Sequence, residues 1–261
     1  MPIDKRRHYV LVVDTETANT ITTDTGKLDM SNVLVYDCGW QVCDTRGNVY
    51  AARSYVNSDI FDGERELMQT AYYASKIPRY ERDLQEGRRI KANTYKIRKA
   101  MLQDMELFEI EEVVAHNARF DLNALNTTLR WTTSSKFRYW FPYGTKIWCT
   151  MKMANSVICK MPTYRDFCEA NGYLTKNGQL RKTAEVLWRF ISGDNEFVES
   201  HTGLEDVQIE AQIMAYCFRQ HKSLVKELFK NQIDRESPTD FQRALFRSLR
   251  KCPTIPMGWA A

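Results

Sequence analysis

The 261-residue chain has 43% hydrophobic and 27% charged residues, a composition that excludes a disordered protein and suits one large folded domain with an appendage. No apolar run approaches the roughly 20 residues of a bilayer-spanning helix, and the first residues lack the apolar stretch of a signal peptide. The net charge is only +4, and the seven scattered cysteines form no C-x-x-C pair. We therefore expect a cytoplasmic protein, in a bacterium or in the cytosol of a virus's host, with no membrane partner and no zinc–thiolate site.

The N-terminal part of the chain predicts three antiparallel strands. Tyr9–Val13 is a short, apolar, mostly β-branched run that ends at Asp14, as is typical of a buried strand. Val33–Cys43 and Val49–Val56 predict two more strands, with a turn over Asp44–Asn48 between them.

A locally basic segment follows the predicted strands. From about Asp62 to Glu111 the residues are mostly helix formers, so two or three helices are expected there. Within this stretch, residues 76–99 contain nine basic and three acidic side chains, a local excess of +6. Such a segment suits contact with phosphates, although a solvated helix face with internal ion pairs explains it equally well. Its basic residues are Lys76, Arg79, Arg82, Arg88, Arg89, Lys91, Lys96, Arg98 and Lys99.

The chain then alternates strands and helices. Val113–Ala115 and Lys146–Thr150 predict the fourth and fifth strands, and a helix from about Ala118 to Leu129 lies between them. A strand meander followed by alternating strands and helices predicts an α/β fold, with a mixed five-stranded sheet flanked by helices.

The last third is predicted to be helical. Thr202 and Glu205 form a capping box that opens a long helix reaching about Lys230. We expect a main domain over residues 1–220 and a helical extension over residues 221–261. The extension carries an amphipathic helix beginning near Ser237, which we expect to pack on the domain rather than to bind a partner. The apolar face of that helix consists of Phe241, Leu245, Phe246 and Leu249.

Two carboxylates stand at the end of the first predicted strand. Asp14 and Glu16 are two residues apart, so they project from the same face of an extended chain. Carboxylates so placed repel one another unless they are protonated or bridged by a cation. A hard divalent ion such as Mg²⁺ or Mn²⁺ prefers such oxygen ligands. The motif is short, and on its own it is more often a solvated strand end.

Two further acidic positions have a comparable setting. Asp121 follows the fourth strand in His116–Asp121, in the first turn of a helix where its charge is favourable. Asp206 lies about one turn into the helix that Thr202 opens, and His201 lies just outside that helix. This arrangement suits a fixed metal ligand beside a movable proton acceptor.

Taken together, these three motifs resemble those of the DEDDh (DnaQ-like) 3′→5′ exonuclease family, which has a ribonuclease H-like fold. They are Asp14-x-Glu16, His116-Asn-x-x-Phe-Asp121 and His201-x-x-x-x-Asp206, in the family's order. The resemblance covers about residues 8–220. The tyrosine-type variant of the family has Tyr four residues before its last Asp, where this chain has Thr202.

The resemblance implies an enzyme that removes nucleoside 5′-monophosphates one at a time from a 3′ end. Asp14, Glu16, Asp121 and Asp206 would hold two Mg²⁺ or Mn²⁺ ions, and His201 would act as general base on the attacking water. The ends acted on would be single-stranded or frayed. The same resemblance implies a pocket for the terminal nucleotide and a backbone path over the basic segment. The residues expected to bind substrate are Thr15, Thr17, Asn117, Phe120, Arg88, Arg89 and Lys91.

Several alternatives remain open at the level of the sequence. The leading interpretation is a DNA exonuclease, working alone or as the proofreading partner of a DNA polymerase or replication protein. An RNA exonuclease of the oligoribonuclease or RNase T type has the same chemistry, because recognition of the 2′-hydroxyl depends on pocket shape. An inactive nucleic-acid-binding module is disfavoured because all four acids and the histidine are present.

Overall fold

The computed structural model describes residues 3–4, 6–18, 33–69, 74–135 and 137–228. The chain divides into two compact units, residues 1–228 and residues 229–261, and all described residues belong to the first. The amphipathic helix predicted near Ser237 lies outside the described residues.

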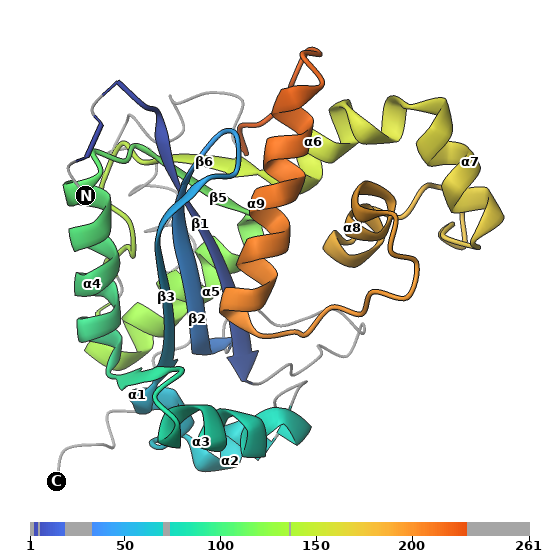
Figure 1. The fold of residues 1–261 in the computed structure, drawn as a ribbon. Helices are drawn as coiled ribbons and strands as arrows, with labels where there is room; N and C mark the ends of the chain where they lie inside the picture. Colours follow the sequence, from blue (N-terminus) through green and yellow to red (C-terminus); the bar gives the residue numbers. More distant parts are fainter. Residues whose placement is uncertain (1–2, 5, 19–32, 70–73, 136, 229–261) are drawn as a thin grey trace, which may run out of the picture. The chain divides into compact units, whose positions relative to one another are not determined.

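A mixed six-stranded sheet forms the centre of this unit, in the order β4-β3-β2-β1-β5-β6 (Figure 1). Strand β1 pairs antiparallel with β2 and parallel with β5, β2 pairs antiparallel with β3, and the β3–β4 and β5–β6 pairs are parallel. The strands are β1 (Tyr9–Ala18), β2 (Leu34–Asp44), β3 (Val49–Asn57), β4 (Ile90–Ala92), β5 (Glu112–Ala115) and β6 (Lys146–Cys149). The predicted α/β class is confirmed, and the sheet has one strand more than expected.

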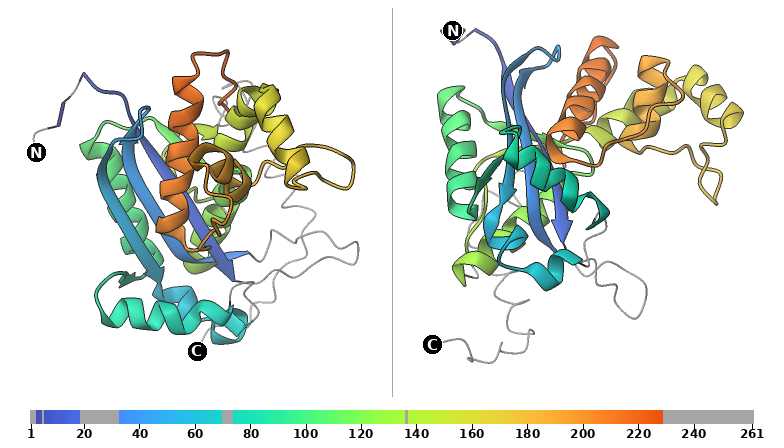
Figure 2. Two further views of the ribbon diagram at one scale, coloured as in Figure 1. Left: turned by 45° about the vertical axis from the view of Figure 1, so that its right-hand side comes forward. Right: turned by 60° about the horizontal axis from the view of Figure 1, so that its bottom comes forward.

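Helices cover both faces of the sheet (Figures 1 and 2). On one face lie α4 (Thr94–Leu107) and α5 (Arg119–Thr133). The indole nitrogen of Trp40 in β2 donates to Asp104 of α4 over 2.9 Å, and the amide of Val35 donates to Thr128 of α5 over 2.8 Å. Helix α9 (Gly203–Arg219) lies on the opposite face. Strand β2 is covered on both sides, and all eleven of its residues are buried.

The remaining helices form two groups around this frame. Helices α6 (Thr150–Ser156), α7 (Pro162–Ala170) and α8 (Ala184–Ser192), with the 3₁₀ turn η3 (Ile158–Lys160), pack with α9 in one hydrophobic cluster. Helices α1 (Ser58–Phe61), α2 (Arg65–Gln69) and α3 (Ile77–Gln85), with the 3₁₀ turn η2 (Ala74–Lys76), lie at the end of the sheet where β1 and β3 finish (Figure 1). This second group therefore borders the C-terminal end of β1, where Asp14 and Glu16 stand.

Two glycines set the distance between α9 and the sheet. A Cβ atom built on Gly39 of β2 would lie 2.2 Å from the backbone carbon of Gly203 and from the backbone nitrogen of Leu204. A Cβ on Gly203 would lie 2.6 Å from the backbone nitrogen of Gly39 and 3.2 Å from the carbonyl oxygen of Asp14. No side chain fits between the two backbones, so the first turn of α9 rests directly on β1 and β2.

Helix α9 is shorter than the sequence pattern predicts. It ends at Arg219 rather than near Lys230, and the chain after it returns to β6. The amide of Cys149 donates to the carbonyl of Lys226, and the amide of Leu228 donates to the carbonyl of Ile147, both over 2.8 Å. The first unit therefore continues to residue 228, beyond the expected boundary at 220. Among the described helices, none combines the length and the apolar character needed to cross a membrane.

Candidate active site

Strand β1 brings the first two carboxylates to the surface of the sheet that faces α9. It runs past the expected end at Asp14 as far as Ala18, with a register shift between Glu16 and Thr17. Asp14 lies opposite Gly39 and Glu16 lies opposite Asp37 in β2. Because Gly39 is where the first turn of α9 touches the sheet, both acids stand beside that turn.

Helix α5 contributes the third carboxylate. Asp121 lies in its first turn and is 3% exposed. The hydroxyl of Thr15 donates to the Oδ1 atom of Asp121 over 2.8 Å, which ties the helix to β1. Asn117 forms the turn between β5 and α5 with a φ of +57°, a left-handed conformation that asparagine tolerates well.

The N-terminus of α9 contributes the fourth carboxylate and the histidine. The Oδ2 atom of Asp206 accepts the backbone N–H of Thr202 over 2.9 Å, and the Thr202 hydroxyl donates to the Oε2 atom of Glu205 over 2.6 Å. The capping box expected between Thr202 and Glu205 is thus altered, because Asp206 rather than Glu205 accepts the N-cap amide. His201 precedes the cap with a φ of +51°, and its side chain is 34% exposed.

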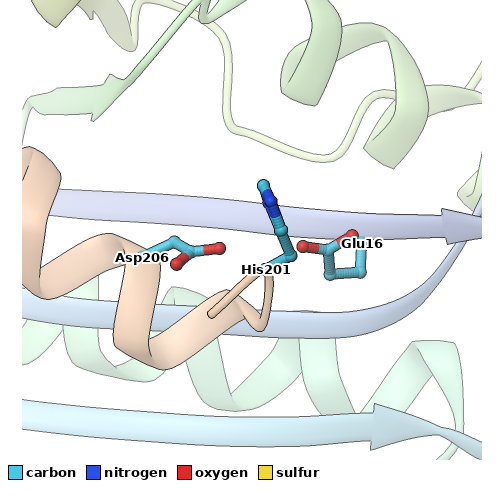
Figure 3. Close-up of side chains that lie close together, drawn as sticks. All are labelled: Glu16, His201 and Asp206. Carbon is cyan, nitrogen blue, oxygen red and sulfur yellow. The ribbon is translucent and has the colours of Figure 1, made fainter. Parts of the chain in front are cut away.

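These elements bring ligand atoms of three residues close together. One ligand atom each of Glu16, His201 and Asp206 lies within 4.8 Å of the others. Figure 3 shows the carboxyl groups of Glu16 and Asp206 directed toward one another, with the imidazole of His201 between them. Asp14 also interacts electrostatically with Asp121, Glu16 and Asp206. The structure therefore brings Glu16, His201 and Asp206 together, and it places Asp14 and Asp121 near enough to interact electrostatically, outside that three-residue group.

Burial makes this cluster costly to charge. It raises the pKa of Glu16 to about 9, with further contributions from Asp37 and Asp206. It likewise raises the pKa of Asp206 to about 8 and that of Asp121 to about 7, although the hydrogen bond from Thr15 opposes the shift at Asp121. The pKa of Asp14 is raised well above its usual range, first by burial and then by neighbouring carboxylates. A bound cation would relieve this repulsion and restore the charged forms.

Sequence reasoning missed one buried acid beside the cluster. Glu210 is 3% exposed and accepts the backbone N–H of His116 over 3.0 Å through its Oε2 atom. Burial and the charges of Asp121 and Asp206 raise its pKa well above the usual range. Its spacing of four residues from Asp206 on one helix was a signal that could have found it, because such residues share a helix face.

A second missed acid lies under the first turn of α9. Asp37 is fully buried, and its Oδ2 atom accepts the hydroxyl of Tyr80 over 2.7 Å and the amide of Gly203 over 3.0 Å. Its position opposite Glu16 follows from strand register, which sequence periodicity did not define.

Arg89 lies in a buried network of ion pairs. Its side chain is 3% exposed and forms ion pairs with Asp37 at 3.3 Å and with Asp83 and Glu205 at 3.1 Å. A guanidinium enclosed by three carboxylates holds β4 and α3 against α9. These ion pairs give Arg89 a structural role, and its contact with the nucleic-acid backbone stays a prediction.

The other predicted substrate residues have varied environments. Arg88 is 57% exposed and pairs with Asp83 and Glu86, while Lys91 is 41% exposed and pairs with Asp62 at 2.9 Å. Both remain within reach of solvent. Of the four remaining predicted substrate residues, Thr15 and Thr17 are buried, Phe120 is half-buried and Asn117 is exposed.

Comparison with known structures finds a similar fold in several nucleases. No family model matches the sequence, and no curated protein matches it either. The nuclease domain of 3′hExo, a DEDDh family member, bound to rAMP is similar in structure, with a TM-score of 0.51 and 12% identity over 85% of this chain and 98% of that one. The 3′-exonuclease that recognises the histone mRNA stem-loop has a TM-score of 0.53 and 10% identity, over 88% of this chain and 71% of that one.

A third similar structure is exonuclease I from Methylocaldum szegediense. It has a TM-score of 0.51 and 12% identity, over 82% of this chain and 41% of that one. These likenesses show that the chain has the ribonuclease H-like fold predicted from its motifs, in the form found in 3′-exonucleases.

Proposed function

We propose that this protein is a metal-dependent 3′→5′ exonuclease of the DEDDh type that releases nucleoside 5′-monophosphates. The observation that carries the proposal is that ligand atoms of Glu16, Asp206 and His201 lie together, with Asp14 interacting electrostatically with Glu16, Asp206 and Asp121. These residues come from three distant parts of the sequence and meet at the C-terminal end of β1. The fold shared with 3′-exonucleases supports the same reading.

The residues at this site fit a pair of divalent cations. Three buried carboxyl groups and the half-buried Asp14 supply only oxygen ligands, which Mg²⁺ and Mn²⁺ prefer. Burial is the main cause of their raised pKa values, and a bound cation would favour their charged forms. Asp14, Glu16, Asp121 and Asp206 are the proposed ligands. When bound, two such ions would supply Lewis-acid activation of a water and stabilisation of negative charge on the phosphate and the leaving 3′-oxygen.

His201 is proposed to accept the proton of the attacking water. Burial, and then the charge of Lys76, lower the pKa of its imidazole, so the ring is neutral and able to accept a proton at neutral pH. Its place outside α9, on a partly exposed loop, lets it reach a solvent molecule next to Glu16 and Asp206.

The proposed substrate is DNA with a single-stranded or frayed 3′ end, and a polymerase or replication protein is a proposed partner. An RNA substrate is the second candidate, and one observation favours it. The 3′hExo nuclease domain, which is bound to rAMP, and the exonuclease that recognises a histone mRNA stem-loop share this fold.

A time course on 5′-labelled oligonucleotides tests the proposal. Single-stranded DNA and an RNA of the same sequence are incubated with Mn²⁺, and parallel reactions contain EDTA. The proposal predicts a ladder that shortens from the 3′ end and is abolished by EDTA, and the faster substrate identifies the preferred sugar. Binding of both oligonucleotides without shortening of either would instead favour an inactive nucleic-acid-binding module.

A further inference from the structure

The loop that carries His201 adopts a backbone conformation that its neighbours must maintain. His201 has a φ of +51°, a region that is sterically unfavourable for a residue with a Cβ atom and persists where surrounding contacts enforce it. The peptide on its N-terminal side belongs to Ser200, and the residue on its C-terminal side is the N-cap Thr202. Contacts at these two positions therefore contribute to the placement of the imidazole.

Lys76 provides the contact on the N-terminal side. It is the last residue of η2, and its ammonium group donates a hydrogen bond to the carbonyl oxygen of Ser200. One turn further along, Arg79 pairs with Glu205 of α9 at 3.2 Å. Two cations of the basic segment, one at the end of η2 and one in α3, thus bind residues 200–205. Sequence analysis assigned the same cations to solvent or to substrate phosphates.

The ammonium group of Lys76 also lies close to the candidate metal ligands. The hydroxyl of Ser200, the residue whose carbonyl oxygen Lys76 binds, donates to the Oδ1 atom of Asp206 over 3.4 Å, and a ligand atom of Glu16 lies within 4.8 Å of one of Asp206. A positive charge beside these carboxylates attracts them and repels a cation that they bind. In the metal-free protein, Lys76 therefore supplies part of the positive charge that divalent ions would bring to these carboxylates.

We propose that Lys76 is a positioning residue with two opposing effects: it tethers the His201 loop through Ser200, and its charge weakens metal binding by Glu16 and Asp206. The catalytic part of this inference rests on the proposed nuclease function. The effects on the loop and on metal affinity depend only on the protein itself.

Three variants separate these effects. Lys76→Met removes both the charge and the donor, Lys76→Arg retains both, and Lys176→Met makes the same charge change at an exposed lysine in the turn over residues 175–178. The measurements are amide hydrogen exchange of residues 199–203 without metal, Mn²⁺ affinity by calorimetry, and kcat and KM on the oligonucleotide that the wild type degrades.

For Lys76→Met we expect faster amide exchange in this loop and a Mn²⁺ dissociation constant about three- to tenfold lower, because a repelling charge is gone. We expect kcat to fall about tenfold or more with little change in KM, because the base is no longer held in place. Lys76→Arg should restore slow exchange and the weaker Mn²⁺ affinity, and Lys176→Met should match the wild type.

A general loss of structure would not produce both tighter metal binding and slower turnover. If Lys76→Met leaves exchange and Mn²⁺ affinity unchanged, or weakens Mn²⁺ binding, the inference is overturned. If the wild type proves inactive on every oligonucleotide, the proposed function fails, and the exchange and Mn²⁺ measurements still decide the role of Lys76.

Discussion

At the scale of single residues, the four carboxylates of the candidate site favour metal binding but lower the stability of the metal-free fold. Burial raises the pKa of each of them, and neighbouring carboxylates add to the rise at Asp14, Glu16 and Asp206, so each destabilises the metal-free fold while serving as a proposed ligand. Functional sites often carry such a cost, because groups suited to catalysis are not those that stabilise a core.

Asp206→Asn tests this trade-off directly. The amide keeps an oxygen that can accept the Thr202 N–H but removes the buried charge, so we expect cleavage to be lost and the metal-free melting temperature to rise by a few degrees. Thermal unfolding in EDTA and the oligonucleotide time course measure the two effects. Retained cleavage would remove Asp206 from the site, and a lower melting temperature would show that its charge is not a source of strain.

His201→Ala should separate proton transfer from metal binding. We expect turnover to fall by roughly 10²–10⁴-fold, the usual contribution of a general base, with Mn²⁺ affinity within about twofold of the wild type. His221→Ala, at an exposed histidine beyond the end of α9, is the matched control and should leave both quantities unchanged. Loss of Mn²⁺ binding in His201→Ala would make this histidine a ligand, as its distance to Glu16 and Asp206 also permits.

The sequence predicted the residues that structure brings together at this site but not those that support them. Asp14, Glu16, Asp121, His201 and Asp206 could be found because each lies in a short motif that follows an apolar run or precedes or opens a helix. Asp37 and Lys76 lie in no such motif. Their proximity to the site depends on strand register and on the packing of η2, which are tertiary properties.

At the scale of elements, the contact between the first turn of α9 and β2 determines the geometry of the site. Gly39 and Gly203 allow the two backbones to touch, and Asp37 binds the amide of Gly203. Because Asp206 lies about one turn further along α9, a displacement of this turn changes the distance between Asp206 and Glu16.

Gly39→Ala tests the importance of this contact. The added Cβ would meet backbone atoms at 2.2 Å, so α9 must shift, and we expect a loss of about 1–3 kcal/mol in the free energy of unfolding. We also expect Mn²⁺ affinity and cleavage to fall together. Chemical denaturation, circular dichroism and calorimetry measure these effects. A folded variant with unchanged Mn²⁺ affinity would show that Asp206 does not depend on the Gly39 contact.

At the same scale, the sequence did not predict strand β4, because this strand forms only by pairing with a distant strand. Strand β4 has only three residues, too few to show a periodicity of two, and it lies in a segment of helix formers. It exists because it pairs with β3 and because Arg89, the residue before it, is anchored among Asp37, Asp83 and Glu205. The long, strongly patterned strands β1, β2 and β3 were predicted within a few residues of their bounds, except that β1 runs on through the two acids.

At the scale of the whole molecule, the site couples stability to pH and to metal. The carboxyl groups of an unfolded chain titrate near about pH 4, whereas those of Asp121, Asp206 and Glu16 in the folded protein titrate at about 7, 8 and 9. Between these values the folded state holds more protons than the unfolded state, so the free energy of unfolding falls as pH rises. Asp83 and Glu205 have lowered pKa values and stay charged through this window. The lowered pKa values of His116, about 4, and of His201 oppose the effect below about pH 6.5, but the carboxyl groups with raised pKa values outnumber these two histidines.

We therefore expect the metal-free melting temperature to decrease between about pH 5 and about pH 8, with Mn²⁺ stabilising the protein more at the higher pH, where its ligands are deprotonated. Calorimetric scans in EDTA and in excess Mn²⁺ at both pH values measure this dependence. Asp206→Asn should reduce both effects. A melting temperature that rises with pH in EDTA would contradict the raised pKa values of these carboxylates.

The central claim is that the five residues of the candidate site hydrolyse the terminal phosphodiester with water, and the released product tests it most directly. Digestion of the preferred oligonucleotide in H₂¹⁸O with Mn²⁺, followed by mass spectrometry, identifies both the product and the nucleophile. We predict nucleoside 5′-monophosphates that each carry one ¹⁸O atom at the phosphate, and no release by Asp206→Asn. Nucleoside 3′-monophosphates, or 5′-monophosphates without ¹⁸O, would contradict the account.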